Sequence, residues 1–162
     1  MENAVLDEFD LILRLLAGMT VGMAIGWERT LKQQSAGIRT FGLVGLGTAT
    51  AAAIFTGDDQ IDAASRVVQG VLTGIGFLGA GVITLSKARQ RPRGLTTAAA
   101  IWLTAALGCA AGRGDWAIVA TATALGTLLL ALDHSIERWA GRVAGAPPPP
   151  DPPAESGART GS

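Results

Sequence analysis

Charged and hydroxyl side chains at the ends of apolar segments are the residues of this chain best suited to binding chemistry. Glu28 and Arg29 end the first apolar segment, and two later segments begin with residues 37–40 (Gly-Ile-Arg-Thr) and 93–97 (Arg-Gly-Leu-Thr-Thr). Arginines and the positive ends of helix dipoles attract anions, and threonine hydroxyls can cap helix starts. Two interpretations remain open: Glu28 neutralises these arginines in a structural network, or the arginines bind an external phosphate or lipid headgroup.

A second candidate motif is the spacing Gly74, Gly76 and Gly79, which formally matches the G-x-G-x-x-G dinucleotide fingerprint. That fingerprint requires a preceding strand, a following helix and an acidic residue about twenty positions further on. These glycines lie instead inside the apolar residues 67–85, which a basic loop follows. We therefore interpret them as positions where membrane helices approach closely, and we expect no nucleotide cofactor.

Few other residues suit catalysis or metal binding. The single histidine, His134, and the single cysteine, Cys109, form no catalytic or zinc-binding pattern. Asp58, Asp59 and Asp62 could hold Mg²⁺ weakly through water molecules, although a surface loop can be equally acidic without a ligand. We expect neither an enzyme nor a dedicated metal or cofactor site.

Long apolar segments must position these residues. The chain has 162 residues, of which 49% are hydrophobic and 16% charged, whereas a soluble domain is about 25% charged. Five segments of 15 to 19 residues are apolar, near the lower limit for a spanning helix, and lack the polar stripe of a soluble bundle. They are residues 11–27, 41–55, 67–85, 95–111 and 117–132. The sequence therefore predicts an all-α, polytopic membrane protein of five transmembrane helices.

The basic residues predict the orientation of these helices. Arg14 lies inside the first apolar segment; of the other lysines and arginines, ten lie on one side of the predicted membrane and two on the opposite side. The positive-inside rule then places the N-terminus outside and the C-terminus in the cytoplasm. Arg39 and Arg93 lie on the same, cytoplasmic side as Glu28. We favour the internal network there, because charges in membrane proteins usually pair within the protein.

This orientation divides the chain into three parts. They are a short outer segment, residues 1–10, the five-helix membrane domain, residues 11–140, and a Pro-rich disordered cytoplasmic tail, residues 141–162. The formal net charge is zero, so no global electrostatic attraction to nucleic acid is expected.

Small residues predict which helices pack closely. Gly18, Gly22 and Gly26 recur every four residues and therefore share one helix face. The third apolar segment carries a similar set, at Gly70, Gly74, Gly76, Gly79 and Gly81. We expect the first and third helices to pack against each other through these glycines. Ala120 and Ala124 form a weaker pair of small residues that could add the fifth helix to this contact. Asp10 and Arg14, one turn apart, are expected to form an ion pair.

Three segments taken together resemble a known family. They are residues 26–29 (Gly-Trp-Glu-Arg) with residues 36–40 (Ala-Gly-Ile-Arg-Thr), residues 73–83 (Thr-Gly-Ile-Gly-Phe-Leu-Gly-Ala-Gly-Val-Ile), and residues 93–99 (Arg-Gly-Leu-Thr-Thr-Ala-Ala) continuing to Trp102. In this order they are similar to the MgtC/SapB family of bacterial inner-membrane proteins. The resemblance implies a five-helix membrane domain with its N-terminus outside. It also implies an association with growth under Mg²⁺ limitation and, in pathogens, with virulence.

The resemblance is incomplete in two places. Members of the virulence-associated branch carry a sizeable soluble C-terminal domain, whereas about thirty residues follow Leu132 here, so this sequence resembles a short form. The family usually has an acidic residue three positions before the arginine of the outer loop. Here that arginine is Arg66, Ala63 takes the acidic position, and Asp62 lies four residues before it.

Together these observations predict a non-enzymatic inner-membrane regulator or adaptor linked to low Mg²⁺, with the bilayer and another membrane protein or a second copy as partners. The alternative is a transporter or channel for Mg²⁺ or another small solute. Against transport, no carboxylate lies near the middle of an apolar segment. An enzyme acting on lipid headgroups is the least favoured class. The expected site residues are Glu28, Arg29, Arg39, Arg66, Arg93, Thr96 and Thr97.

Overall fold

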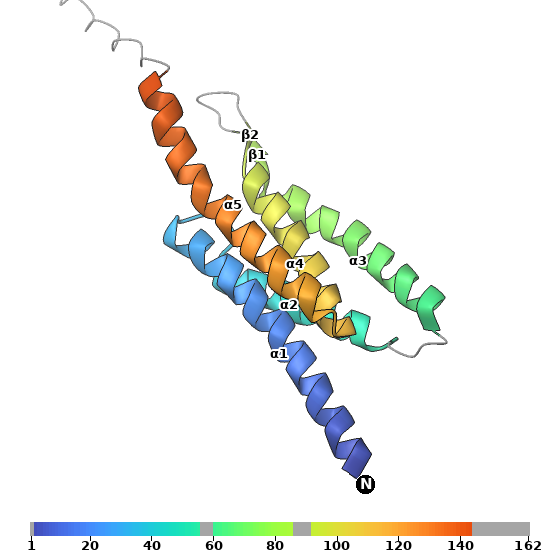
Figure 1. The fold of residues 1–162 in the computed structure, drawn as a ribbon. Helices are drawn as coiled ribbons and strands as arrows, with labels where there is room; N and C mark the ends of the chain where they lie inside the picture. Colours follow the sequence, from blue (N-terminus) through green and yellow to red (C-terminus); the bar gives the residue numbers. More distant parts are fainter. Residues whose placement is uncertain (1, 56–59, 86–91, 144–162) are drawn as a thin grey trace, which may run out of the picture.

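The computed structural model describes residues 2–55, 60–85 and 92–143 (Figure 1). These residues form five helices: α1 (Glu2–Leu31), α2 (Ile38–Ala53), α3 (Ile61–Val82), α4 (Leu95–Arg113) and α5 (Trp116–Val143). The five helices predicted from the apolar segments are therefore confirmed. One short antiparallel pair was not expected: β1 (Thr84–Leu85) pairs with β2 (Pro92–Arg93) ahead of α4.

The helices extend beyond the apolar segments at both ends of the chain. α1 begins at Glu2, so most of the predicted outer segment, residues 1–10, is the first part of this helix. α5 continues to Val143, past the last apolar residue, Leu132. Residues 144–162, most of the predicted tail, lie outside the described residues.

Three stretches of helix are long and apolar enough to cross a membrane. They are Asp7–Leu31, Ile61–Val82 and Leu95–Arg113, and Trp116–Leu132 is a shorter apolar stretch. α2 has 16 residues, which corresponds to about 24 Å of helix against a hydrocarbon thickness of about 30 Å. By length and composition, three of the five helices could therefore cross a bilayer.

Helices α1, α2 and α4 form the centre of the bundle, and α3 and α5 lie at its periphery (Figure 1). α4 is apolar on all sides and contacts each of the other four helices, which explains why 11 of its 19 residues are buried. Its Ile101 and Leu107 join Ile25 of α1 and Phe41 of α2 in one hydrophobic cluster.

The glycines of α1 allow an unusually close contact with α2. A Cβ added at Gly18 would lie 2.6 Å from the Cβ of Ala49, and one at Gly26 would lie 2.8 Å from the Cα of Ile38. At Gly22 it would collide with the carbonyl oxygen of Phe41. These contacts run in opposite directions along the two helices, so α1 and α2 are antiparallel and their backbones nearly touch.

Two glycines of α4 make a similar close contact with the same part of α2, around Gly45 and Ala49. A Cβ at Gly108 would collide with Thr48, and one at Gly112 would collide with the carbonyl oxygen of Ala49. From Gly108 to Gly112 along α4, the contacted residue of α2 moves forward from Thr48 to Ala49, so α2 and α4 are parallel. Their N-termini therefore lie at the end of the bundle where α1 ends.

The expected packing of the first helix against the third is wrong. Among the described residues, α1 packs against α2, α4 and α5, while α3 packs mainly against α4. An added Cβ would meet no atom within 4 Å at four glycines of α3, and only Ala98, at 3.6 Å, at the fifth, Gly79. The four are Gly70, Gly74, Gly76 and Gly81. Glycine spacing identified a face suited to close approach but not the helix that would occupy it. A packing role for the α3 glycines against another molecule stays a prediction.

This difference between α1 and α3 is testable by a pair of matched substitutions. Gly22→Ala forces a methyl group into the Phe41 carbonyl and should cost about 1–3 kcal/mol, because such overpacking shifts the backbone. Gly74→Ala meets open space and should leave stability unchanged or slightly higher, since alanine favours helix. Thermal unfolding in mild detergent measures both. Equal destabilisation by the two variants would contradict the observed packing.

Candidate functional site

The candidate site lies at the end of the bundle where α1 ends and where α2 and α4 begin. The turn from α1 into α2 is fixed by Thr30, whose hydroxyl oxygen accepts a hydrogen bond from the N–H of Ile38 at 2.8 Å and donates to the carbonyl of Gly26 at 2.9 Å. Thr30 therefore caps the start of α2 from the neighbouring helix. The hydroxyl cap expected at Thr40 is not formed, since the N-cap residue, Gly37, has no side chain.

A small ion cluster occupies the last turn of α1. Arg29 Nε lies 2.7 Å from Glu28 Oε2, and the ammonium of Lys32 pairs with Glu28 Oε1. Lys32 also donates to the carbonyl of Leu130 at 3.1 Å, which ties α1 to α5. The carboxylate of Glu28 thus lies between two cations, the buried Arg29 and Lys32, which bonds to α5.

Arg29 is almost completely enclosed, with 2% of its side chain exposed. It lies one turn beyond the buried Ile25 on the inner face of α1, which explains the enclosure. Glu28 binds its Nε, whereas its Nη2 has no hydrogen-bond partner among the described residues. A buried guanidinium is costly, so the carboxylate of Glu28 is important for keeping Arg29 in place.

A loop side chain joins this turn to the start of α4. The hydroxyl of Thr97, which is 1% exposed, donates to Gln34 Oε1 at 3.4 Å, and the N–H of Gln34 donates to the carbonyl of Arg29 at 3.0 Å. Gln34 therefore connects Arg29 to the first turn of α4. Of the residues expected in the site, Glu28, Arg29 and Thr97 join this network. Arg39, Arg93 and Thr96 lie at the same end of the bundle with exposed side chains.

Gly94 explains how α4 can start so close to the end of α3. Its φ of 90° is in the left-handed region, and an added Cβ would collide with the carbonyl oxygen of Val82. Only glycine fits both requirements. As the N-cap residue it provides no side-chain cap, so the cap expected from Thr96 is not formed. Thr96 is instead an exposed residue of the first turn.

The expected pairing of Glu28 with Arg39 or Arg93 is wrong. Glu28 pairs with its sequence neighbours, while Arg39 and Arg93 are exposed and form no ion pair within the described ranges. The short-range partners prevail because they need no additional ordering of a distant side chain. Lys32, which sequence reasoning missed, has the i, i+4 spacing that indicates such a pair.

Arg66 does not belong to this cluster. It is exposed near the start of α3, whereas the end of α3, at Val82, lies beside Gly94 and the site. Arg66 is therefore at the opposite end of the bundle. Its expected functional role stays a prediction that no contact in the described residues supports.

The opposite end of the bundle carries its own charges. Arg14 pairs with Asp10 at 2.6 Å, as the spacing predicted, and donates to the carbonyl of Gly112 at 3.3 Å. The acidic loop considered for Mg²⁺ includes Asp58 and Asp59, which lie outside the described residues. Over residues 2–55, 60–85 and 92–143, no group of three or more His, Cys, Asp or Glu residues could hold a metal ion.

Comparison of the sequence with known proteins identifies its family. The model of the MgtC family matches residues 15–139. Protein SrpB of Synechococcus elongatus is 47% identical over 122 residues, which cover 68% of this chain and 67% of SrpB. Protein MgtC of Salmonella typhimurium is 42% identical over 118 residues, which cover 71% of this chain and 48% of MgtC.

A third relative is the putative magnesium transporter YhiD of Escherichia coli, which is 35% identical over 135 residues, or 78% of this chain and 62% of YhiD. The chain thus spans about half the length of MgtC and somewhat more of YhiD. No solved structure matches this chain.

The dependence of Arg29 on Glu28 predicts the outcome of a double-mutant cycle. Glu28→Gln removes the carboxylate that pairs with the buried guanidinium of Arg29 and should destabilise the protein. We expect a loss near or below the lower end of the about 3–5 kcal/mol typical of broken buried pairs, because the Glu28 side chain is 19% exposed. Adding Arg29→Met to Glu28→Gln should recover part of this loss, as measured by thermal unfolding in detergent.

The matched control is Arg39→Gln, which removes an exposed, unpaired charge at the same end and should change stability by less than about 0.5 kcal/mol. Strict additivity of the Glu28 and Arg29 variants, or an equal effect of Arg39→Gln, would show that the pair does not stabilise this end of the bundle.

Proposed function

This chain belongs to the MgtC family, and we propose that it is a non-enzymatic membrane regulator or adaptor that acts in bacterial adaptation to low Mg²⁺. The link to magnesium comes from the family and from the name of YhiD, putative magnesium transporter. We further propose that all five helices cross the bacterial inner membrane, with the N-terminus outside and the C-terminus in the cytoplasm. The excess of basic residues at one end supports this orientation.

The observation that carries the proposal is the close backbone packing of α1, α2 and α4 at the centre of the bundle. Gly18, Gly22 and Gly26 bring α1 against the α2 backbone, and Gly108 and Gly112 bring α4 against the same helix, so that the three helices contact one another. The ion pairs of the described residues lie at the two ends: Asp10–Arg14 and Arg113–Asp115 at one, the Glu28 cluster at the other. A transport site near the bilayer midplane would need polar ligands there.

The exposed arginines suggest how such a protein acts on a partner. Arg39 and Arg93 stand on the ends of two adjacent parallel helices, held in place by the glycine contacts and by Gly94. We propose that they form the cytoplasmic surface through which the protein contacts its partner, while Glu28 and Arg29 maintain the scaffold beneath. In a pathogenic bacterium the same surface would serve the virulence function associated with the family.

The proposed orientation makes a labelling prediction. In a Cys109→Ala background, a cysteine placed at Ser35 should react with a membrane-impermeant maleimide only after the cytoplasmic side is opened. A cysteine at Asp115 should react in intact spheroplasts, because the start of α5 is on the outside. Both positions are exposed. The reverse pattern would overturn the orientation, and labelling of both from one side would overturn the odd number of crossings, three, between them.

Regulation and transport make opposite predictions for Mg²⁺ flux. Purified protein in liposomes should show no saturable Mg²⁺ uptake above empty vesicles, while the same gene restores growth of a deletion strain at low Mg²⁺. Arg39→Glu and Arg93→Glu should reduce that growth several-fold without lowering the amount of folded protein, since both side chains are exposed. Growth curves and an internal Mg²⁺ dye give both readouts.

Arg113→Glu is the matched control, because Arg113 is an exposed arginine at the opposite end of the bundle. It should leave growth at low Mg²⁺ unchanged. Robust, saturable uptake that is lost in Glu28→Gln would establish the competing function, a transporter, and would reject the regulator.

A further inference from the structure

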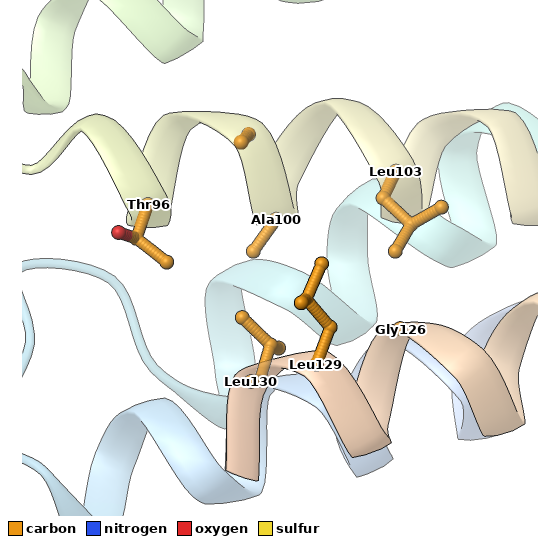
Figure 2. Close-up of a pocket in the computed structure, with 7 residues that line it drawn as sticks. Thr96, Ala100, Leu103, Gly126, Leu129 and Leu130 are labelled. Carbon is orange, nitrogen blue, oxygen red and sulfur yellow. The ribbon is translucent and has the colours of Figure 1, made fainter. Parts of the chain in front are cut away.

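A groove between α4 and α5 has no role in the site described above. Its volume is about 220 Å³, and its lining is apolar except for one residue (Figure 2). The lining residues are Thr96, Ala99, Ala100 and Leu103 from α4 and Gly126, Leu129 and Leu130 from α5.

Small side chains keep this groove open. Gly126 is a point of close contact, since an added Cβ there would lie 2.6 Å from Leu103 Cδ2. Further along the two antiparallel helices, Ala99 and Ala100 provide only methyl groups against Leu129 and Leu130. The groove therefore begins at the Leu103–Gly126 contact and continues toward the start of α4.

The polar groups of the groove are all at one end. Figure 2 shows Thr96 and Leu130 at one end of the groove and Leu103 and Gly126 at the other. The hydroxyl of Thr96 lies on the side away from Leu103. The ammonium of Lys32 bonds to the Leu130 carbonyl and therefore lies at the Thr96 end as well. An ammonium has three protons, and Glu28 and Leu130 accept two of them, which leaves one for a ligand.

The charges around this end favour an anion. Lys32 and the exposed Arg93 are positive, the first turn of α4 has no side-chain cap on its N–H groups, and Arg29 nearby is also positive. The carboxylate of Glu28 is the opposing charge, and it is already paired with both Arg29 and Lys32. The end of the groove therefore carries net positive charge next to a hydroxyl donor.

We propose that this groove binds an anionic phospholipid, with one acyl chain along Ala99 and Leu129 and the phosphate on Lys32 and Thr96. Thr96 and Leu103 are about 10 Å apart along α4, so the groove accepts part of an acyl chain. An apolar groove that ends in a cation and a hydroxyl matches the order of groups in a phospholipid. Arg93 adds positive charge near this end, but the phosphate contacts only Lys32 and Thr96, so the proposal does not require the proposed partner surface.

The test is native mass spectrometry of the full-length protein transferred from vesicles of defined composition. Vesicles contain equal amounts of phosphatidylglycerol and phosphatidylcholine with identical acyl chains. Wild-type protein should retain one lipid and prefer phosphatidylglycerol by about tenfold. Lys32→Gln should abolish this preference, and Lys32→Arg should retain it, because the charge next to Leu130 is preserved.

Two further variants separate the acyl groove from the headgroup site. Ala99→Phe fills the groove and should reduce retention of both lipids, while Leu128→Phe, on the exposed side of α5, should have no effect. Thr96→Val removes the exposed hydroxyl with little change in shape and should weaken only the phosphatidylglycerol preference. If Lys32→Gln does not fold, Thr96→Val decides the question.

Three results would overturn the proposal. The first is equal retention of the two lipids by the wild type, and the second is unchanged lipid retention in Ala99→Phe. The third is displacement of the bound lipid by millimolar inorganic phosphate, because this would show a site for free phosphate that does not need an acyl chain. Thermal unfolding of each variant confirms that a lost preference does not reflect a lost fold.

Discussion

Backbone contact between α1, α2 and α4 is the constraint on which the rest of the structure depends. Within a bilayer, apolar side chains gain little by leaving lipid for protein, so helices associate through van der Waals contact and require small residues at the interface. Gly22 meets the carbonyl of Phe41 in α2, and Gly112 meets the carbonyl of Ala49 in the same helix. The three helices α1, α2 and α4 also contact one another, so each of them is held by two neighbouring backbones.

This contact determines where charge can be placed. Gly26 is the last of the three glycines of α1 that contact α2. Glu28 and Arg29 follow it within one turn, at the end of the bundle where α2 and α4 begin. Arg29 is buried there because its helix face continues the stripe, and it tolerates burial because Glu28 is its immediate neighbour. The exposed Arg39 and Arg93 face outward from the same level. The buried pair thus contributes to the scaffold, and the exposed arginines remain available to a partner.

The sequence predicted the helices and the local ion pair well, and the helix partners poorly. Apolar length alone located all five helices, and the four-residue spacing of Asp10 and Arg14 predicted their pair. Which helix packs against α1 depends on the shape of both helix surfaces. The row of glycines on α1 can pack against any helix that also presents small residues. Gly45 of α2, in an apolar segment with no obvious stripe, was the partner, while the denser glycine run of α3 was not. Helix dipoles favoured the distant Arg39 and Arg93 as partners of Glu28, but Arg29 and Lys32 lie within one turn of it and pair with it without ordering a distant segment.

The two peripheral helices follow from the same constraint. Once α1 and α2 occupy two sides of α4, the remaining helices can only add to the outside, and they reach α4 through fewer small residues. α3 accordingly leaves Gly70 and Gly74 facing open space, and α5 touches α4 closely at Gly126 but leaves a groove beside Ala99. A rigid centre with incompletely packed outer helices offers surfaces to lipid and to another protein without requiring the centre to open. That division of roles suits a regulator better than an alternating-access transporter, whose central helices must move against one another.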